Sequence, residues 1–150
     1  MKGLVWGAFS GVHDPPRPEM WRGRSTPRYR GGVGVSTNGG LHWTVSNQWM
    51  PQTSVTHILM YPESPVGKRV LYATGFGKGV YTSIDNGKTW ALDNSGIIEA
   101  QPFAWRLTQT KEGTLYLVLA RESEGRDAPA SQDGALYRST DKAEHWTRMN

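Results

Sequence analysis

A short segment recurs three times along the chain and constrains its fold more than any other feature. The copies read STNGGLHW at 36–43, SIDNGKTW at 83–90 and STDKAEHW at 139–146. The second copy begins 47 residues after the first, and the third begins 56 residues after the second. Self-similarity at a period of this size is typical of repeat folds, in which each copy belongs to one supersecondary unit.

Short hydrophobic runs surround each copy in a constant order, separated by turn residues. A first run and an alternating run precede each copy, and a further short run begins at its tryptophan. The first runs lie at 4–10, 70–76 and 115–121, and the alternating runs lie at 32–37, 79–84 and 135–140. Two units carry an additional run at their start, at 55–61 and 103–110. None of these segments has a helical period, so the chain is predicted to be all-β.

Units of four short strands at this spacing are the blades of a β-propeller. We therefore predict a β-propeller fragment of about three four-stranded antiparallel blades. The predicted blade borders are 1–50, 51–98 and 99–150, and the first blade lacks its inner strand. The repeated segment is then the turn between the third and fourth strands of each blade.

The residue types of the repeated segment suit a tight turn followed by a buried ring. Asp85 can accept hydrogen bonds from backbone N–H groups two or more residues on. Gly87 can supply a positive φ that a Cβ would penalise. Trp90 can bury its ring between neighbouring sheets while its N–H finds an acceptor. In the third copy Ala143 stands where glycine is expected, so that turn is predicted to be strained or differently shaped.

The three segments resemble the Asp-box, or BNR, repeat, whose pattern is serine, any, aspartate, any, glycine, any, threonine, tryptophan. The residues that carry the resemblance are Ser36, Asn38, Gly40, Trp43, Ser83, Asp85, Gly87, Trp90, Ser139, Asp141 and Trp146. The repeat occurs in bacterial sialidases, xyloglucan-cleaving propellers, the sortilin-type receptor propeller and photosystem-assembly propellers. The resemblance implies a propeller related to glycoside hydrolases and an extracellular or periplasmic location. It also implies structural turn residues and ligand sites on the opposite face, near the central axis.

About three blades do not close a propeller, which typically needs four to eight. An incomplete ring exposes unpaired strand edges, which natural proteins avoid. We therefore expect the chain to associate with the remaining blades of a larger propeller or with a second copy of itself. Two copies would supply six blades.

Composition and charge exclude several kinds of site. The chain has no cysteine, so disulfides and thiolate ligands are absent. Its four histidines are scattered, and we predict no metal site and no cofactor. No apolar run approaches the ~20 residues of a membrane helix, and the opening MKGLVWGAF is assigned to a strand instead of a signal peptide. The net charge of +4 is concentrated in residues 15–31; one arginine-rich loop gives little support for nucleic-acid binding.

Long connectors on one face of a repeat array commonly form its binding face. The connector at 11–31 is long and basic, and a polar one spans 122–134. Arginines can grip carboxylates or phosphates, and an exposed tryptophan or tyrosine can stack on a sugar ring. The predicted ligand-binding residues are His13, Arg17, Trp21, Arg22, Tyr29 and Trp49. The alternative is a solvated loop whose arginines lie in water.

A glycosidase commonly needs two carboxylates that flank the scissile bond. Asp14 is the first candidate because it follows a strand end closely. The other candidates on loops are Glu19, Glu99, Glu122, Glu124, Asp127 and Asp133. The arginine-isoleucine-proline motif of sialidases is absent, which argues against that activity. The segment GFGKG at 75–79 is interpreted as a hairpin turn and not as a phosphate loop, because a strand follows it.

Two functions fit these observations. The first is a fragment of a propeller related to glycoside hydrolases, exo-sialidase-like or glucanase-like, which binds a carbohydrate or anionic ligand on its connector face. The alternative is a non-catalytic propeller that docks a protein or peptide, with Trp21 and Trp49 as exposed anchors.

Overall fold

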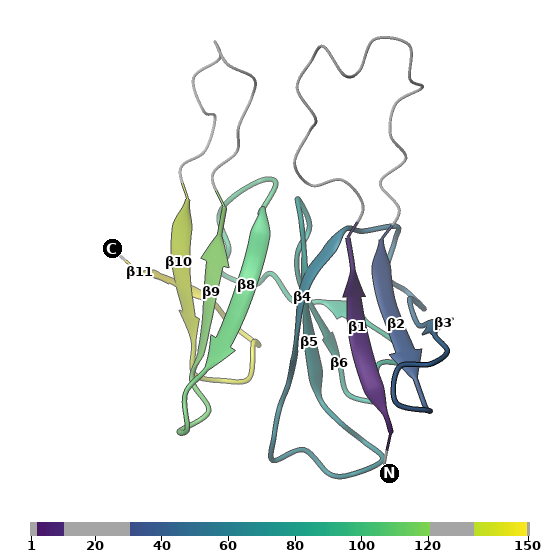
Figure 1. Cartoon of the computed structure of the whole chain (residues 1–150). Helices are drawn as coiled ribbons and strands as arrows, with labels where there is room; N and C mark the ends of the chain where they lie inside the picture. Colours follow the sequence, from purple (N-terminus) through teal and green to yellow (C-terminus); the bar gives the residue numbers. More distant parts are fainter. Residues whose placement is uncertain (1–2, 11–30, 121–133, 150) are drawn as a thin grey trace, which may run out of the picture.

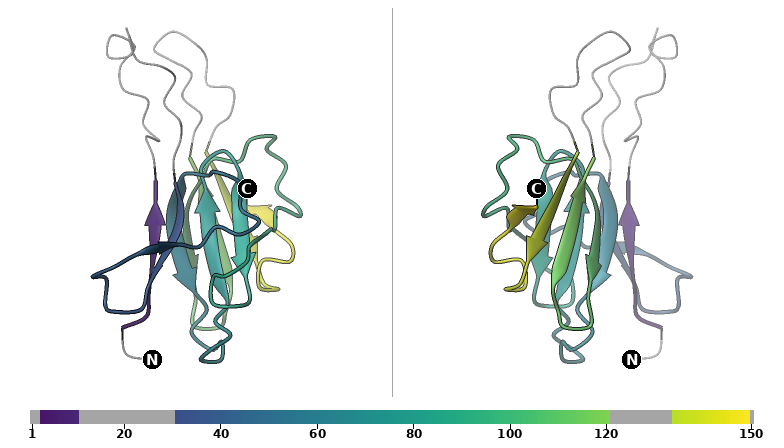
Figure 2. Two further views of the ribbon diagram at one scale, coloured as in Figure 1. Left: turned by 90° about the vertical axis from the view of Figure 1, so that its right-hand side faces the viewer. Right: turned by 90° about the vertical axis from the view of Figure 1, so that its left-hand side faces the viewer.

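The computed structural model describes residues 3–10, 31–120 and 134–149. The all-β prediction is confirmed, since the described residues form eleven strands and no helix. The strands make three antiparallel sheets, which lie side by side in Figures 1 and 2. The first sheet contains β1 (Val5–Phe9), β2 (Gly32–Ser36) and β3 (Thr44–Val45); the middle sheet contains β4 (Val55–Met60), β5 (Leu71–Gly75), β6 (Gly79–Ser83) and β7 (Ala91–Leu92); the last sheet contains β8 (Ala104–Gln109), β9 (Leu115–Leu119), β10 (Ala135–Ser139) and β11 (Thr147–Met149).

The sheets pack face to face and bury one hydrophobic core in each of the two gaps. Between the first and middle sheets the core includes Val33, Leu71, Ala73, Tyr81 and Trp90. Between the middle and last sheets it includes Tyr72, Val80, Leu107, Leu115, Leu117, Tyr137 and Trp146. The strands follow this arrangement: β5, covered on both faces, is buried throughout, whereas buried and more exposed residues alternate along β9. A strand covered on both faces can be apolar at successive positions.

Side-chain hydrogen bonds define the turn between β6 and β7. The Ser83 hydroxyl donates to Asp85 Oδ1 (2.8 Å) and accepts from the N–H of Gly87 (2.8 Å). Asp85 Oδ1 also accepts from the N–H of Thr89 (3.0 Å). The bonds that the serine makes recur at Ser139 and at Ser36 in the other two turns. The turns at 37–43, 84–90 and 140–146 therefore share one geometry, and we call them the tryptophan turns.

The prediction for the third tryptophan turn was half right. Lys142 and Ala143 have φ values of 61° and 74°, close to the 68° and 80° of Asn86 and Gly87. The turn therefore keeps its shape, and the expectation of a different shape was wrong. The expectation of strain holds, because an L-residue in the left-handed region costs roughly 1–2 kcal/mol. The buried Ala143 N–H still donates to the Ser139 hydroxyl (3.0 Å).

The tryptophan of each turn connects its sheet to the preceding one. Trp90 Nε1 donates to the carbonyl of Ser46 (2.8 Å), and Trp146 Nε1 donates to that of Asp93 (3.0 Å). Each acceptor lies three residues after the preceding tryptophan in sequence. Both rings are buried, with exposed fractions of 2% and 1%, whereas Trp43 of the first sheet is 41% exposed. The prediction that these rings pack between sheets is confirmed for Trp90 and Trp146.

Further bonds repeat with the same spacing. The main-chain N–H of Trp90 donates to the Gln48 carbonyl (3.1 Å), and that of Trp146 donates to the Ser95 carbonyl (2.8 Å). The side chain of Asn94, four residues after Trp90, accepts from the Val80 N–H (2.9 Å).

The described residues contain no helix that is long and apolar enough to cross a membrane.

Replacing a buried tryptophan should be far more damaging than replacing the exposed one. We expect Trp90→Ala and Trp146→Ala each to lower the free energy of unfolding by ~3–5 kcal/mol through cavity formation. In the monomeric chain, Trp43→Ala should lower it by less than half of that amount, since its ring is 41% exposed. Denaturant titration followed by circular dichroism measures all three. Equal losses at the three positions would contradict the packing described above.

The turn aspartates should make stability depend on acidic pH. Burial raises the pKa of Asp85, but hydrogen bonds from Thr89, Ser83 and Lys88 outweigh it and bring the pKa below the usual 3.8. The Ser139 hydroxyl is the main cause that lowers the pKa of Asp141. Since the folded pKa is depressed, the stabilisation is complete above the unfolded pKa and is lost as pH falls through the folded one.

The first turn, where Asn38 occupies the aspartate position, shows that an amide oxygen supports this geometry: its Oδ1 accepts from the His42 N–H (2.9 Å). We therefore expect the double variant, Asp85→Asn with Asp141→Asn, to fold. Its free energy of unfolding should fall less steeply below about pH 4 than that of the unchanged chain. Thermal unfolding at a series of pH values measures this difference. Identical pH profiles would contradict it.

Candidate functional site

Three segments meet at one edge of the sheets, opposite the tryptophan turns. They are the final parts of the two inter-sheet connectors, 51–54 and 99–103, and the turn 76–78 between β5 and β6. We call this the connector edge; it lies where β4 and β8 begin and β5 ends, at the top of Figure 1. The Phe76 N–H donates to the Ser54 carbonyl (2.9 Å), which fixes the turn against the first connector.

The inner strands β4 and β8 each contain a β-bulge close to this edge. In β4 the register passes from Val55 to His57, and in β8 it passes from Ala104 to Arg106. The extra residue in β8 is Trp105, which is 39% exposed. Bulges are common next to functional sites because they redirect a side chain.

Three aromatic rings cluster at the connector edge. The Phe76 and Phe103 ring centroids are 4.8 Å apart with an interplanar angle of 52°, and those of Phe76 and Trp105 are 6.2 Å apart at 73°. Gly77, with φ 71°, allows the tight turn that carries Phe76. Phe76 comes from the middle sheet, whereas Phe103 and Trp105 belong to the start of the last sheet, so the cluster spans the gap between the two.

An open cavity of about 350 Å³ lies beside these rings, and we call it the aromatic cavity. Its lining residues are Gln52, Thr53, Ser54, Phe76, Lys78, Gln101 and Phe103. The lining is mainly apolar, with two amides, two hydroxyls and one ammonium group. Sites for small molecules typically combine apolar walls with a few polar groups that fix orientation.

The Ser54 hydroxyl beside this cavity is one of five buried side-chain polar groups without a hydrogen-bond partner in the described part of the chain. Its oxygen is buried and has no hydrogen-bond partner among the described residues. Buried polar groups nearly always have a partner, and an exception needs an explanation. Thr53, in contrast, already donates to the Pro51 carbonyl (2.7 Å).

Most predicted site residues lie outside the described residues. This holds for the catalytic candidate Asp14 and for the ligand-binding candidates His13, Arg17, Trp21, Arg22 and Tyr29, and also for Glu19, Glu122, Glu124, Asp127 and Asp133. Their roles stay predictions.

Two of the predicted catalytic and ligand-binding candidates, Trp49 and Glu99, belong to the described residues, and both lie in the inter-sheet connectors. Trp49 is 74% exposed and does not line the aromatic cavity. Glu99 Oε2 accepts from the hydroxyl of Tyr137 (2.6 Å), which also accepts from the Ile98 N–H (3.2 Å). Burial and the bond to Glu99 raise the pKa of Tyr137. The phenol is therefore a fixed donor that orders the connector.

Reasoning from sequence missed Phe76 and Phe103. The prediction that GFGKG forms a hairpin turn is confirmed, since residues 76–78 join the antiparallel strands β5 and β6. That prediction, however, treated Phe76 as part of a turn without function. The sequence signal that could have identified Phe76 is an aromatic residue in a short turn at the edge where the connectors lie. The approach of Phe103 depends on how adjacent sheets pack, which no local pattern shows.

The chemistry of the cavity suits binding more than proton transfer. Among the lining residues that the structure describes there is no carboxylate. Within the described residues, no group of three or more histidine, aspartate or glutamate side chains converges as a metal site would require. The nearby strand β4 carries His57. Burial and the charge of Arg106 lower the pKa of its imidazole.

Comparisons with known proteins identify the architecture. No family model matches the chain, and no curated protein matches it. A GH74 enzyme from Niastella koreensis has a similar structure, with a TM-score of 0.57, 22% identity, and coverage of 78% of this chain and 18% of that one. The GH74 xyloglucanase from Xanthomonas campestris gives a TM-score of 0.52, 16% identity, and coverage of 79% and 19%.

GH74 enzymes have β-propeller folds, so the predicted fold class is confirmed: the chain is a β-propeller fragment whose three antiparallel sheets are blades. At these identities the similarity shows the fold alone. The chain spans 18% and 19% of the length of the two enzymes, which is consistent with a part that needs further blades. The assignment of the tryptophan turns to the Asp-box stays a prediction.

The unpartnered hydroxyl of Ser54 leads to a stability prediction. Ser54→Ala removes a buried group that forms no hydrogen bond, so the free energy of unfolding should stay unchanged or rise by up to ~1 kcal/mol. Ser64→Ala is the matched control: Ser64 is also buried, but its hydroxyl donates to the Tyr61 carbonyl (2.5 Å). The control should lose about 1 kcal/mol. Denaturant titration compares them, and an equal loss would show that Ser54 has a structural role.

Proposed function

We propose that this chain is the carbohydrate-binding part of a propeller related to glycoside hydrolases, and that the aromatic cavity holds the sugar. One observation carries the proposal: the cavity combines the rings of Phe76 and Phe103 with the polar side chains of Gln52, Lys78 and Gln101. A pyranose presents apolar C–H groups on its faces and hydroxyls at its rim. It therefore needs aromatic walls and hydrogen-bonding groups in one place.

The polar lining supports this assignment. Gln52 and Gln101 can each donate and accept through their amides, and they belong to different connectors. Lys78 adds three donors from the β5–β6 turn. In this proposal the connector residues Arg17, Trp21, Arg22 and Tyr29 extend the ligand surface. The basic residues would then serve acidic substituents of the glycan or another anionic ligand.

The type of glycan is proposed from the similar structures. One of them is a xyloglucanase by name, so we propose a glucanase-like ligand for this cavity in preference to a sialidase-like one. Cleavage would need two carboxylates across the scissile bond. Asp14 is the proposed first carboxylate, and further blades would supply the second. The aromatic cavity itself serves binding.

A second candidate function is the docking of a protein or peptide. The observation that favours it is the pair Trp49 and Ile98, which are 74% and 71% exposed on the two inter-sheet connectors. Exposed tryptophans are common anchors of protein interfaces. A docking surface of this kind would use Trp49 and would not need the cavity.

Calorimetric titration with xyloglucan oligosaccharides tests the proposal. The unchanged chain should bind, and Phe76→Ala and Phe103→Ala should each weaken the affinity at least tenfold, a loss of about 1.4 kcal/mol or more. The control is Ile84→Ala, which changes a 69% exposed side chain in a tryptophan turn and should bind normally. Circular dichroism confirms that each variant is folded.

Trp49→Ala separates the two candidate functions. It should leave oligosaccharide affinity within about twofold of the unchanged chain, because Trp49 does not line the cavity. Oligosaccharide binding that survives both phenylalanine substitutions would contradict the proposed site.

A further inference from the structure

The outward face of the first sheet repeats positions that are buried in the other two sheets. Val5 pairs with Ser36 as Leu71 pairs with Ser83 and Leu115 with Ser139. Leu71 and Leu115 are both 0% exposed, whereas Val5 is 39% exposed. The same contrast separates Trp43 from the tryptophans of the other turns. We call the surface formed by Val5, Phe9 and Trp43 the leading face.

Two aromatic rings dominate the leading face. Phe9 is 47% exposed, and its ring packs edge-on against Trp43, with centroids 5.6 Å apart at 82°. The ring of Phe9 covers Gly34, where a Cβ would lie 2.4 Å from it. The middle sheet places Tyr81 at the position of Gly34, buried against the first sheet. The leading face is therefore shaped like the faces that pack inside the molecule, but in the described residues nothing covers it.

The outward face of the last sheet shows the complementary half of the same contact. Val118 pairs with Leu136 as Thr74 pairs with Val80 in the middle sheet. Thr74 and Val80 are 0% exposed, whereas Val118 and Leu136 are 45% and 41% exposed. Met149, opposite Leu136 in β11, is 39% exposed. We call the surface formed by Val118, Leu136 and Met149 the trailing face.

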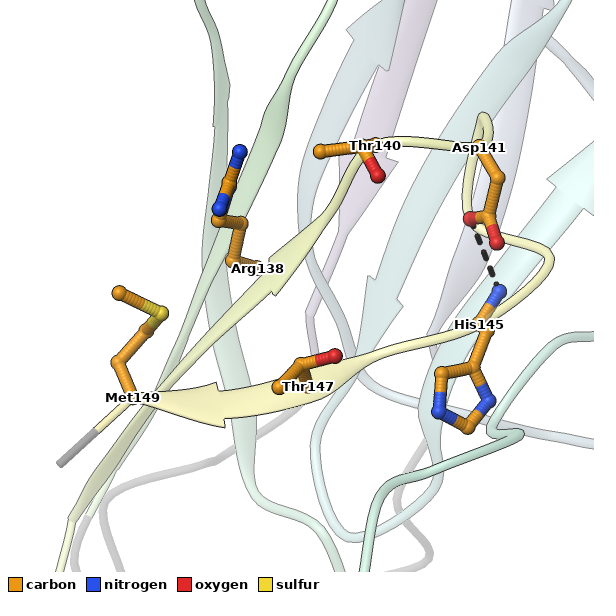
Figure 3. A pocket seen from close by; sticks show the side chains of 6 residues that line it. All are labelled: Arg138, Thr140, Asp141, His145, Thr147 and Met149. Carbon is orange, nitrogen blue, oxygen red and sulfur yellow. Dashed lines mark hydrogen bonds between the residues drawn. The ribbon is translucent and has the colours of Figure 1, made fainter.

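A hollow lies in the trailing face beside the segment that ends at Met149. Figure 3 shows its lining along the β10–β11 hairpin, with Arg138, Thr147 and Met149 on the strands and Asp141 and His145 in the turn. Met149 follows Trp146 by three residues, as Asp93 follows Trp90. The Asp93 carbonyl is the one that accepts the indole N–H of the next blade.

The leading face thus carries the donor of this hydrogen bond, and the trailing face carries the equivalent acceptor. Trp90 Nε1 donates both to Gly87 in its own turn (3.1 Å) and to Ser46 of the preceding sheet (2.8 Å). Trp43 Nε1 donates to Gly40 in its own turn (2.9 Å). By the same spacing, the carbonyl that would complete the second bond is that of Met149, on the trailing face.

We propose that a second copy of this chain docks head to tail, with the leading face of one copy against the trailing face of the other. In this contact the Trp43 indole of one copy donates to the Met149 carbonyl of its partner. The contact is heterologous, and such contacts form a closed ring when the rotation closes. Two copies related by a two-fold axis make the contact twice and supply six blades, within the four to eight of closed propellers.

The association state of the 150-residue chain tests the proposal. Each chain has a mass of 16.7 kDa, so sedimentation velocity should show a particle of twice this mass at micromolar concentration. A folded monomer at that concentration would overturn the proposal. Carbohydrate binding is measured separately, so neither result decides the other.

Two variants that block opposite faces give the sharper test. Trp43→Arg and Leu136→Arg should each sediment as monomers, because each variant loses one half of the contact. Mixed together they should form a heterodimer, in which the trailing face of the first variant meets the leading face of the second. Leu92→Arg, which changes a 53% exposed residue outside both faces, is the control and should still dimerise.

The outcome also determines the symmetry of the contact. If Leu136→Arg alone dimerises as well as the unchanged chain, two leading faces pair with each other and the head-to-tail arrangement is wrong. Should either variant fail to fold by circular dichroism, Phe9→Arg replaces Trp43→Arg and Val118→Arg replaces Leu136→Arg. A mixture of folded variants that stays monomeric would also overturn the proposal.

Discussion

The structure depends on one repeated interaction, in which a tryptophan buried between two sheets donates its indole N–H to a carbonyl of the preceding sheet. Trp90 reaches Ser46 and Trp146 reaches Asp93. The ring fills the gap between the sheets. The hydrogen bond joins the turn of one sheet to the segment that follows the outer strand of the preceding sheet. Burial of the ring and the hydrogen bond thus act together to hold neighbouring sheets against each other.

Sequence reasoning was reliable where the determinants are local. The strands, the tryptophan turns and the antiparallel sheets follow from residue types at fixed offsets, such as Ser83, Asp85 and Trp90. Ala143 shows the limit of this approach. The glycine position suggested a changed turn, but the bonds to Ser139 and Asp141 hold the backbone in the same shape. Several hydrogen bonds together outweigh the preference of a single residue.

The candidate site was harder to foresee because its parts come from different sheets. Phe76 and Phe103 meet only because two sheets pack in a particular way. Trp105 is the extra residue of a bulge, which the residue types do not predict. The sequence had pointed to the same edge, since connectors on one face commonly form the binding surface. It favoured the arginine-rich segment at 11–31, whereas the described residues point to apolar walls with amides and hydroxyls. The two views are compatible, because both place recognition at the connector edge.

The tryptophan turns and the connector edge lie at opposite ends of the strands. Each inter-sheet connector contributes to both: Ser46 and Asp93 accept the indole hydrogen bonds, whereas residues 52–54, 101 and 103 line the aromatic cavity. Neither acceptor lies in the connector between β1 and β2 or in the one between β5 and β6. A connector of this kind can differ in length, from three residues at 76–78 to the long segment 11–31, without displacing either indole from its carbonyl. Such a scaffold can diversify its specificity by insertion while the assembly of its sheets is inherited unchanged.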